Sequence, residues 1–322
     1  MPYVEVNSLS RRYGNFALHD ISFSMESGEI LAILGPSGAG KTSILRNICG
    51  LDRPDRGTVS IEGEDVTSVP VEKRGIGMIF QDLALFPHLT AFDNIAFGLR
   101  ALRKPPSEVR SAVNEIADLF RVKDVLGRLP SQISGGQRQR VALARSVVVS
   151  PKAILMDEPL SSLDPSLRIE IRNEIKSIAQ TIGLTVIYVT HDIHEALYLG
   201  DRVGIVMDGR LRRIGSQREV FLNPGKADVA SFLGYNLIKI EGRMVGVFPS
   251  DFDLSVAKED LEGSVTAVGF EGDRLRMLVD CGAYSPVTVF LPYDTALPDL
   301  RKGKKVRLKI RRRIDLDDTE LS

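Results

Sequence analysis

The stretch Gly35-Pro-Ser-Gly-Ala-Gly-Lys41-Thr42 decides the fold. It follows the apolar run Glu29-Ile-Leu-Ala-Ile-Leu34, which predicts a buried strand, and it opens a predicted helix from Lys41 to Gly50. This is the spacing of a phosphate-binding loop, in which glycines let backbone N–H groups turn toward phosphates at a helix N-terminus. Lys41 is placed to reach the β- and γ-phosphates, and Thr42 to ligate Mg²⁺. The predicted nucleotide-binding residues here are Gly35, Ser37, Gly38, Gly40, Lys41, Thr42 and Ser43.

Around this loop, short apolar runs alternate with helical patterns through about residue 230, which predicts an α/β domain over residues 1–232. Further buried-strand candidates are Ala153–Met156, Thr185–Val189 and Arg202–Val206. Between about residues 88 and 150 the pattern becomes helical. Within Ser107–Phe120, for example, Val109, Val113 and Ile116 recur near helical spacing. We therefore expect a helical subdomain inserted into the α/β domain.

Residues 233–322 have a different pattern of apolar and polar residues. Arg274–Val279 and Lys305–Ile310 alternate apolar and polar residues, and Gly- and Pro-containing turns separate such stretches. This pattern is typical of a small all-β sandwich or barrel, so we expect a second, OB-like domain there.

Composition excludes several classes of protein. The chain has 322 residues, with 42 Lys+Arg against 42 Asp+Glu, so its overall charge gives no reason to expect a nucleic-acid partner. Its two cysteines, Cys49 and Cys281, lie far apart, which argues against a disulfide framework or a zinc site and favours a reducing compartment. The N-terminus lacks a signal-peptide pattern, and no run of about 20 apolar residues suggests a membrane span.

Two adjacent carboxylates end one of the predicted strands, in Ala153-Ile-Leu-Met-Asp157-Glu158-Pro159. A carboxylate at the end of a buried strand needs a cation or another partner to offset its desolvation. Asp157 suits the Mg²⁺ shell, and Glu158 is then placed to polarise an attacking water as a general base.

A third motif, Ile133-Ser-Gly-Gly-Gln137, precedes a predicted helix that ends at Val149. A Gly-Gly pair before a helix is also common as a simple turn, so this motif alone decides nothing. Together with the phosphate loop and Asp157-Glu158, it resembles the signature of ABC ATPases, with Ile133 in place of the usual Leu. In that family the signature of one chain faces the phosphate loop of a second. The resemblance therefore implies that Ser134, Gly135, Gly136 and Gln137 complete a partner's site.

Four more positions resemble the ABC pattern, in the family order, and the resemblance covers about residues 3–233. Gln81 resembles the glutamine that couples Mg²⁺ and water to the membrane subunit, and His191 the switch histidine at the γ-phosphate. Asp164, in Ser161–Asp164, resembles the loop that crosses to the opposite protomer, and Tyr13 the aromatic stacked on adenine. The implied catalytic residues are Glu158, His191 and Gln81, and the implied Mg²⁺ ligands are Thr42, Gln81 and Asp157.

The resemblance implies a mechanism and partners. Two copies of the chain are expected to sandwich two ATP molecules, with Mg²⁺, and to couple hydrolysis to solute uptake. The channel is expected in separate transmembrane permease subunits that dock near Asp82–Thr90, with Phe86 at the contact. A substrate-binding protein is expected to join indirectly. The chain itself is then a peripheral protein at the cytoplasmic face of the membrane.

The C-terminal part resembles the TOBE-type domains of importer ATPases of the maltose, spermidine, ferric iron, sulfate and molybdate group. The junction Glu219–Pro224 is typical of them, and Val245–Asp251 resembles their Val-Gly-x-Arg-Pro-Glu segment, with Phe248 for Arg and Ser250 for Glu. The tail is short for a sugar importer, so an inorganic ion, either an oxyanion or ferric iron, is expected as cargo in preference to a sugar or polyamine.

Some alternatives stay open. Residues 301–313 carry nine cations, which fit either the solvated face of an edge strand, the interpretation we favour, or an anion site. For the whole chain, a soluble ABC ATPase of DNA repair or translation is the main alternative, although no long heptad insertion and no second ATPase domain is evident. An exporter and a P-loop kinase fit less well.

Overall fold

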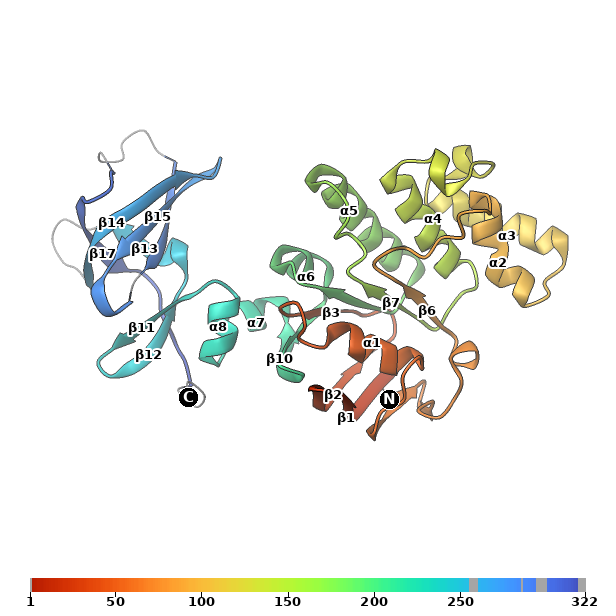
Figure 1. Cartoon of the computed structure of the whole chain (residues 1–322), viewed down its shortest axis with the longest axis horizontal. Coiled ribbons are helices and arrows are strands. Elements are labelled where there is room, and N and C mark those ends of the chain that lie inside the picture. The colour runs from red at the N-terminus through yellow and green to blue at the C-terminus, as the bar shows by residue number, and fades with distance from the viewer. Residues whose placement is uncertain (1, 255–259, 285, 294–299, 318–322) are drawn as a thin grey trace. The chain divides into compact units, whose positions relative to one another are not determined.

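The computed structural model describes residues 2–254, 260–284, 286–293 and 300–317. The chain divides into two compact units, residues 1–217 and 218–322 (Figure 1). The boundary expected from the sequence, after residue 232, lies further along the chain. The reason is local packing: helices α7 (Gln217–Leu222) and α8 (Ala227–Phe232) precede the β-strands of the second unit, and the Tyr235 hydroxyl donates a 2.7 Å hydrogen bond to the carbonyl of Phe221 in α7.

A six-stranded sheet forms the centre of the first unit, in the order β10-β9-β3-β8-β7-β6. Its strands are β3 (Ile30–Leu34), β6 (Ile76–Ile79), β7 (Ala153–Asp157), β8 (Val186–Thr190), β9 (Arg202–Met207) and β10 (Arg210–Ser216). All neighbouring pairs are parallel except β9 and β10. The carboxyl ends of parallel neighbours meet at one edge, where chemistry-bearing side chains gather in such sheets.

Both faces of this sheet are buried, which explains why its strands read as continuous apolar runs. Ile154 and Met156 of β7 pack into one core with the helical segment, whereas Leu155 packs into the other with α1 (Lys41–Cys49). That second core also contains a four-stranded antiparallel sheet in the order β2-β1-β4-β5. Its strands are β1 (Val4–Tyr13), β2 (Phe16–Met25), β4 (Arg56–Ile61) and β5 (Glu64–Asp65).

The segment between residues 90 and 150 is helical. It contains α2 (Ala91–Ala101), α3 (Pro106–Leu119) and α4 (Gly135–Val147), with the short 3-10 helices η2 (Lys123–Val125) and η3 (Pro130–Gln132). Another 3-10 helix, η1 (Val71–Lys73), precedes β6. In α3, Val109 and Val113 are buried, as the apolar spacing predicted. Two further helices, α5 (Pro165–Ile182) and α6 (Ile193–Leu199), follow β7 and β8.

The second unit contains two antiparallel sheets. One has the order β11-β12-β18 and the other β13-β17-β14-β15-β16, and both contribute to a single apolar core. The strands are β11 (Asn236–Ile240), β12 (Arg243–Val247), β13 (Phe252–Leu254), β14 (Leu261–Phe270), β15 (Arg274–Asp280), β16 (Val287–Pro292), β17 (Lys305–Ile310) and β18 (Ile314–Asp315), with 3-10 helices η4 (Pro249–Asp251) and η5 (Gly282–Tyr284). Asn236 links the sheets, since its side chain exchanges hydrogen bonds with the backbone of Thr288.

The basic segment 301–313 corrects one expectation. Its strand β17 pairs with β13 on one side and β14 on the other, so it is an interior strand of its sheet and the edge-strand interpretation was wrong. Val306 and Leu308 are buried, and the intervening Lys305, Arg307 and Lys309 are exposed. The alternation therefore places the cations on the outer face of a paired strand.

Within the described residues, no helix combines the length and apolar character that a membrane crossing requires.

Candidate active site

The phosphate-binding loop connects β3 to α1 and depends on its glycines. A Cβ on Gly35 would lie 2.0 Å from the carbonyl oxygen of Val206 on β9, so only glycine permits this approach of loop to strand. Gly40 has φ 101° and forms the N-cap of α1 without a side-chain cap. The first N–H groups of a helix have no intrahelical partners, so this N-terminus is free to receive an anion.

Lys41 places its ammonium group inside the loop. The side chain is buried, and its Nζ donates hydrogen bonds of 2.9 Å to the carbonyls of Gly35 and Pro36. Nζ also lies 3.5 Å from Oε1 of Glu158. Burial lowers the pKa of Lys41, while the charge of Glu158 acts in the opposite direction. The loop thus holds a cation at its centre, which suits a polyphosphate.

Asp157 ends β7 as a buried carboxylate. It is 7% exposed and accepts a 3.0 Å hydrogen bond from the Thr42 hydroxyl. Burial raises the pKa of Asp157 despite that hydrogen bond. A hydroxyl and a desolvated carboxylate next to a phosphate loop are the oxygen ligands that Mg²⁺ takes in nucleotide sites, so these residues fit the metal.

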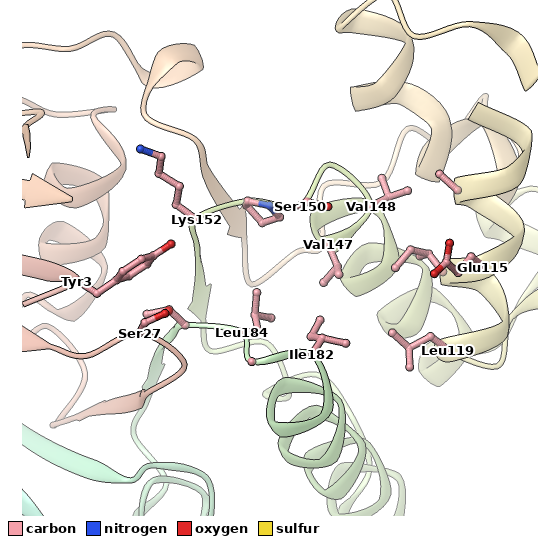
Figure 2. Close-up of a pocket in the computed structure, with 15 residues that line it drawn as sticks. Tyr3, Ser27, Glu115, Leu119, Val147, Val148, Ser150, Lys152, Ile182 and Leu184 are labelled. Atoms are coloured by element: carbon pink, nitrogen blue, oxygen red, sulfur yellow. The ribbon is translucent and has the colours of Figure 1, made fainter. Parts of the chain in front are cut away.

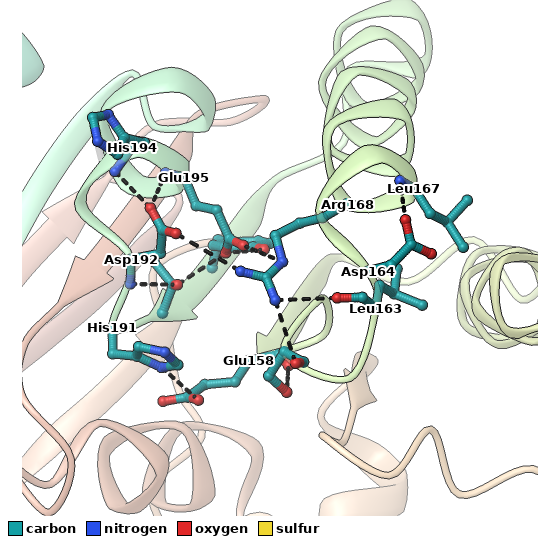
Figure 3. Close-up of polar contacts among 12 residues, drawn as sticks. Glu158, Leu163, Asp164, Leu167, Arg168, His191, Asp192, His194 and Glu195 are labelled. Atoms are coloured by element: carbon teal, nitrogen blue, oxygen red, sulfur yellow. Dashed lines mark hydrogen bonds and ion pairs between the residues drawn. The ribbon is translucent and has the colours of Figure 1, made fainter. Parts of the chain in front are cut away.

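Glu158 contacts two basic side chains, one with each oxygen of its carboxylate. Its Oε2 lies 2.9 Å from Nδ1 of His191, which follows β8 (Figure 3). Its Oε1 lies 3.5 Å from Nζ of Lys41. Glu158 has φ 44°, in the left-handed region, and its N–H donates to the carbonyl of Val189. This turn directs the carboxylate away from the sheet, where it can accept a proton from a water molecule.

Gln81 follows β6 and lies beside the same residues. It lines a cavity of about 380 Å³ together with Ser37, Lys41, Thr42 and Glu158. It also lines a neighbouring open pocket with Asp157 and Ser161. The predicted loop residues Gly38, Gly40 and Ser43 border the first cavity as well. The structure therefore brings together the predicted residues that follow β3, β6, β7 and β8.

The signature residues lie elsewhere. Ser134 is the N-cap of α4, and it forms a reciprocal capping box with Gln137. Gly136 packs closely under Leu167 of α5, since a Cβ on Gly136 would lie 2.8 Å from Leu167 Cδ1. The lining of the cavity at Lys41 includes none of the four signature residues, Ser134, Gly135, Gly136 and Gln137. Asp164, also absent from that cavity, caps α5, and the N–H of Leu167 lowers its pKa by hydrogen bonding.

Phe16 was missed by the sequence reasoning. It lines the cavity at the phosphate loop, and its ring would meet any Cβ placed on Gly40. Tyr13, the predicted adenine contact, stacks on Phe16 with ring centroids 6.4 Å apart. The Tyr13 hydroxyl accepts from Asn47 and donates to Asp52, both near the end of α1. The sequence signal is the dipeptide Gly14-Asn15, which is typical of a two-residue hairpin turn, and the structure pairs Tyr13 with Phe16 across it.

Another pocket, of about 670 Å³, has no part in this chemistry. It lies at the amino ends of β7 and β8, where Lys152 and Thr185 precede the strands, and Leu119 of α3 and Ile182 of α5 close it (Figure 2). The phosphate-loop residues and the Asp157–Glu158 pair belong to the opposite, carboxyl ends of the same sheet.

Comparison with known proteins agrees with this geometry. Residues 18–161 match the ABC transporter family. The molybdate/tungstate import ATP-binding protein WtpC of Pyrococcus horikoshii is 41% identical over 95% of this chain and 89% of its own length. The sulfate/thiosulfate import ATP-binding protein CysA of Bradyrhizobium diazoefficiens is 38% identical over 96% and 98%. Among solved structures, cbiO1 of Clostridium perfringens, part of the ABC transporter complex cbiONQ, has a TM-score of 0.64 and 28% identity, over 69% of this chain and 92% of that one.

The phosphate loop, the carboxylate pair and the helical segment define an ABC-type P-loop ATPase. The chain belongs to the ABC transporter family, in the group of import ATP-binding subunits. It is an ATPase that uses ATP with Mg²⁺. Mg²⁺, when bound, would neutralise charge at the phosphates; the loop N–H groups and Lys41 would hold the nucleotide, and Thr42 and Asp157 would hold the metal.

Proposed function

We propose that two copies of this chain close on two ATP molecules and couple hydrolysis to the uptake of a tetrahedral oxyanion through separate transmembrane subunits. One observation carries the proposal: Lys41, Asp157, Glu158 and His191 gather in one site, while the signature at Ser134 is displayed on another helix, outside the cavity. A signature that does not serve its own site is available to a second copy.

Within each site, positioning and electrostatics do most of the work. Lys41 and the N-terminus of α1 bind and orient the phosphates. Glu158 takes the proton of the attacking water, and His191 and Lys41 hold that carboxylate in place. Gln81 connects this cavity to the segment Asp82–Thr90, where we propose that the permease docks.

The cargo proposal rests on two relatives, WtpC of Pyrococcus horikoshii and CysA of Bradyrhizobium diazoefficiens, which align over 95% and 96% of this chain. Their names describe import of molybdate/tungstate and of sulfate/thiosulfate. All of these are tetrahedral dianions. A substrate-binding protein outside the membrane would select among them, and the ATPase would work as a peripheral subunit at the cytoplasmic face.

The test is purification of the chain from gently solubilised native membranes, followed by identification of the proteins that accompany it. The proposal expects a multi-span membrane protein and a binding protein that retains molybdate, tungstate or sulfate. A binding protein that takes only sugars or polyamines would overturn the cargo. Recovery from the soluble fraction alone would overturn the transport function and revive a soluble ABC ATPase.

A further inference from the structure

The guanidinium group of Arg168, one turn into α5, contacts two separate parts of the site. Its Nη2 donates to the carbonyls of Leu163 at 3.2 Å and Ser161 at 3.5 Å. Its Nη1 and Nε lie 3.9 and 3.8 Å from the carboxylates of Asp192 and Glu195 (Figure 3). The first pair belongs to the loop after Glu158, and the second to the segment after β8 that carries His191.

The loop side of this contact begins at the catalytic carboxylate. The N–H and hydroxyl of Ser161 both donate to the carbonyl of Glu158, at 3.2 and 2.9 Å. The loop ends at Asp164, which caps α5, and Arg168 donates its own N–H to the Asp164 carbonyl. A displacement of the loop therefore moves the carbonyls that Arg168 holds.

The other side of the contact fixes the residues on both sides of His191. Glu195 is buried, and its Oε2 accepts 2.9 Å hydrogen bonds from Tyr188 and Thr190. The Thr190 hydroxyl in turn accepts from the N–H of Asp192, whose carboxylate caps α6 through the N–H groups of His194 and Glu195. Thr190 and Asp192 are the chain neighbours of His191, so this network sets the position of the imidazole.

Arg168 supplies a positive charge that this network needs. A buried carboxylate is costly unless it is paired, and the second oxygen of Glu195, Oε1, lies 3.8 Å from Nε of Arg168. Three of the four contacts are 3.5 Å or longer, so the guanidinium is shared between the two sides and is not fixed to either. Within the described residues, its Nε is buried without a hydrogen-bond partner. A small shift of the loop therefore shortens one set of contacts and lengthens the other.

We propose that Arg168 is a positioning residue that transmits the placement of the loop 161–164 to His191, and so to the 2.9 Å contact between His191 and Glu158. The inference rests on the proposed function, in which two copies of the chain close on ATP, and on the expectation that the loop ending at Asp164 crosses to the opposite protomer. Arrival of the partner would then adjust the catalytic carboxylate through Arg168, without a direct contact of the partner with His191.

The experiment compares full-length Arg168→Gln with Arg172→Gln, a matched change one turn further along α5, where the guanidinium lies 4.2 Å from the Tyr198 ring and not in the site. We expect Arg168→Gln to lower kcat about tenfold, within the range of typical coupling between sites, and to lower the Hill coefficient for ATP toward about one. Binding of a non-hydrolysable ATP analogue should match that of Arg172→Gln.

Two further variants separate positioning from stability. Arg168→Gln/Glu195→Gln removes both charges, so it should recover thermal stability without recovering kcat. Recovery of kcat together with stability would overturn the proposal. In a His191→Ala background, Arg168→Gln should lower kcat no further, because both changes interrupt one path. An additive loss would also overturn it. A wild-type chain that stays monomeric with ATP would contradict the proposed dimer. The comparison of Arg168→Gln with and without His191→Ala would still decide the role of Arg168.

Discussion

Oε2 of Glu158 lies 2.9 Å from Nδ1 of His191, although the two residues follow different strands of the core sheet. The parallel pairing of β7 with β8 creates this relationship, because Asp157, the last residue of β7, is in register with Val189, the last but one residue of β8. The other oxygen of the same carboxylate faces Lys41 at 3.5 Å. Both oxygens of the carboxylate thus contact side chains of the same chain, the kind of fixed orientation that preorganised catalysis requires.

Glu158→Gln tests the assignment of the general base. The amide keeps the shape of the side chain but cannot take a proton from water, so we expect kcat to fall by about 10²–10⁴-fold, the usual contribution of a general base. ATP should still bind, since Lys41 and the loop are unchanged. The control is Glu170→Gln, an exposed glutamate that pairs with Arg140 on the surface. If kcat for ATP hydrolysis by Glu158→Gln stayed within about threefold of that of the control, Glu158 would be excluded as the base.

Asp157→Asn should raise the thermal stability of the nucleotide-free protein at neutral pH. Burial raises the pKa of Asp157 above its ordinary 3.8, so the folded state loses stability as pH rises through the interval between the ordinary and the raised value. The asparagine avoids that loss and can keep the hydrogen bond from Thr42.

The measurement for Asp157→Asn is Tm by calorimetry from pH 7 toward pH 4. The advantage of the variant should shrink as the wild-type carboxylate becomes protonated. With ATP and Mg²⁺ present the order should reverse, because only the wild type gains the metal ligand. A variant that is less stable than the wild type without nucleotide would contradict the desolvation argument.

Tyr188→Phe should destabilise the fold because it removes a donor to the buried Glu195. Leaving a buried acceptor with fewer partners costs about 1–3 kcal/mol, measured as the free energy of unfolding in urea. Tyr198→Phe is the comparison: that ring is 40% exposed and packs against Arg172 and Lys176, so losing its hydroxyl should change little. Equal effects for the two variants would argue against the network at Glu195.

Much of the α/β unit could be predicted from the sequence because its strands are buried on both faces and its loops carry fixed spacings. The strands predicted around Ile30, Ile154, Ile187 and Val203 all formed, and so did β17 at residues 305–310. The parallel order then brings Lys41, Asp157 and His191 to one edge. The gathering of these three residues can therefore be predicted without knowing the conformation of the loops.

Other features depended on contacts that no local pattern encodes. Phe16 reaches the phosphate loop because β1, β2 and α1 pack into one apolar core. The role of Arg168 depends on two loops that both contact its side chain. The position of β17 inside its sheet required the pairing of distant strands, so its alternation could not distinguish an edge from an interior strand. Likewise, α7 and α8 look like the end of the first domain in the sequence, but Tyr235 holds α7 to the second unit.

Phe16→Ala should weaken ATP binding. The ring borders the cavity at Lys41 and stacks against Tyr13, and stacking on an aromatic ring contributes about 1–3 kcal/mol per base where it has been measured by alanine substitution. We expect a rise in the Kd for ATP of about 5- to 150-fold by that range. Tyr13→Phe keeps both rings and removes only the hydroxyl bonds to Asn47 and Asp52, so it should bind ATP nearly normally. Fluorescent-nucleotide titration distinguishes them, and unchanged binding by Phe16→Ala would remove that ring from the site.

Phe86→Asp tests the proposed docking site of the permease. The ring of Phe86 lies 4.5 Å from that of Phe97, whose side chain is 47% exposed, and 5.7 Å from the Arg145 guanidinium. The segment that carries Phe86 directly follows Gln81, which lines the nucleotide cavity. A partner bound at Phe86 would therefore be connected to that cavity through the backbone. The Phe86 backbone is held by Asn94, independently of the ring, so the loop should keep its conformation in the variant.

For Phe86→Asp we expect ATP binding by the isolated chain to be unchanged, while oxyanion uptake into vesicles containing the whole transporter falls at least about tenfold, as for a central interface residue. Phe270→Asp is the matched control, because that phenylalanine is 60% exposed in the second unit and its replacement also places a carboxylate on an aromatic surface. If Phe86→Asp vesicles transport as well as the control, the permease docks elsewhere. If the variant instead loses ATP binding, the ring supports the nucleotide cavity, and the change in transport no longer reports on docking.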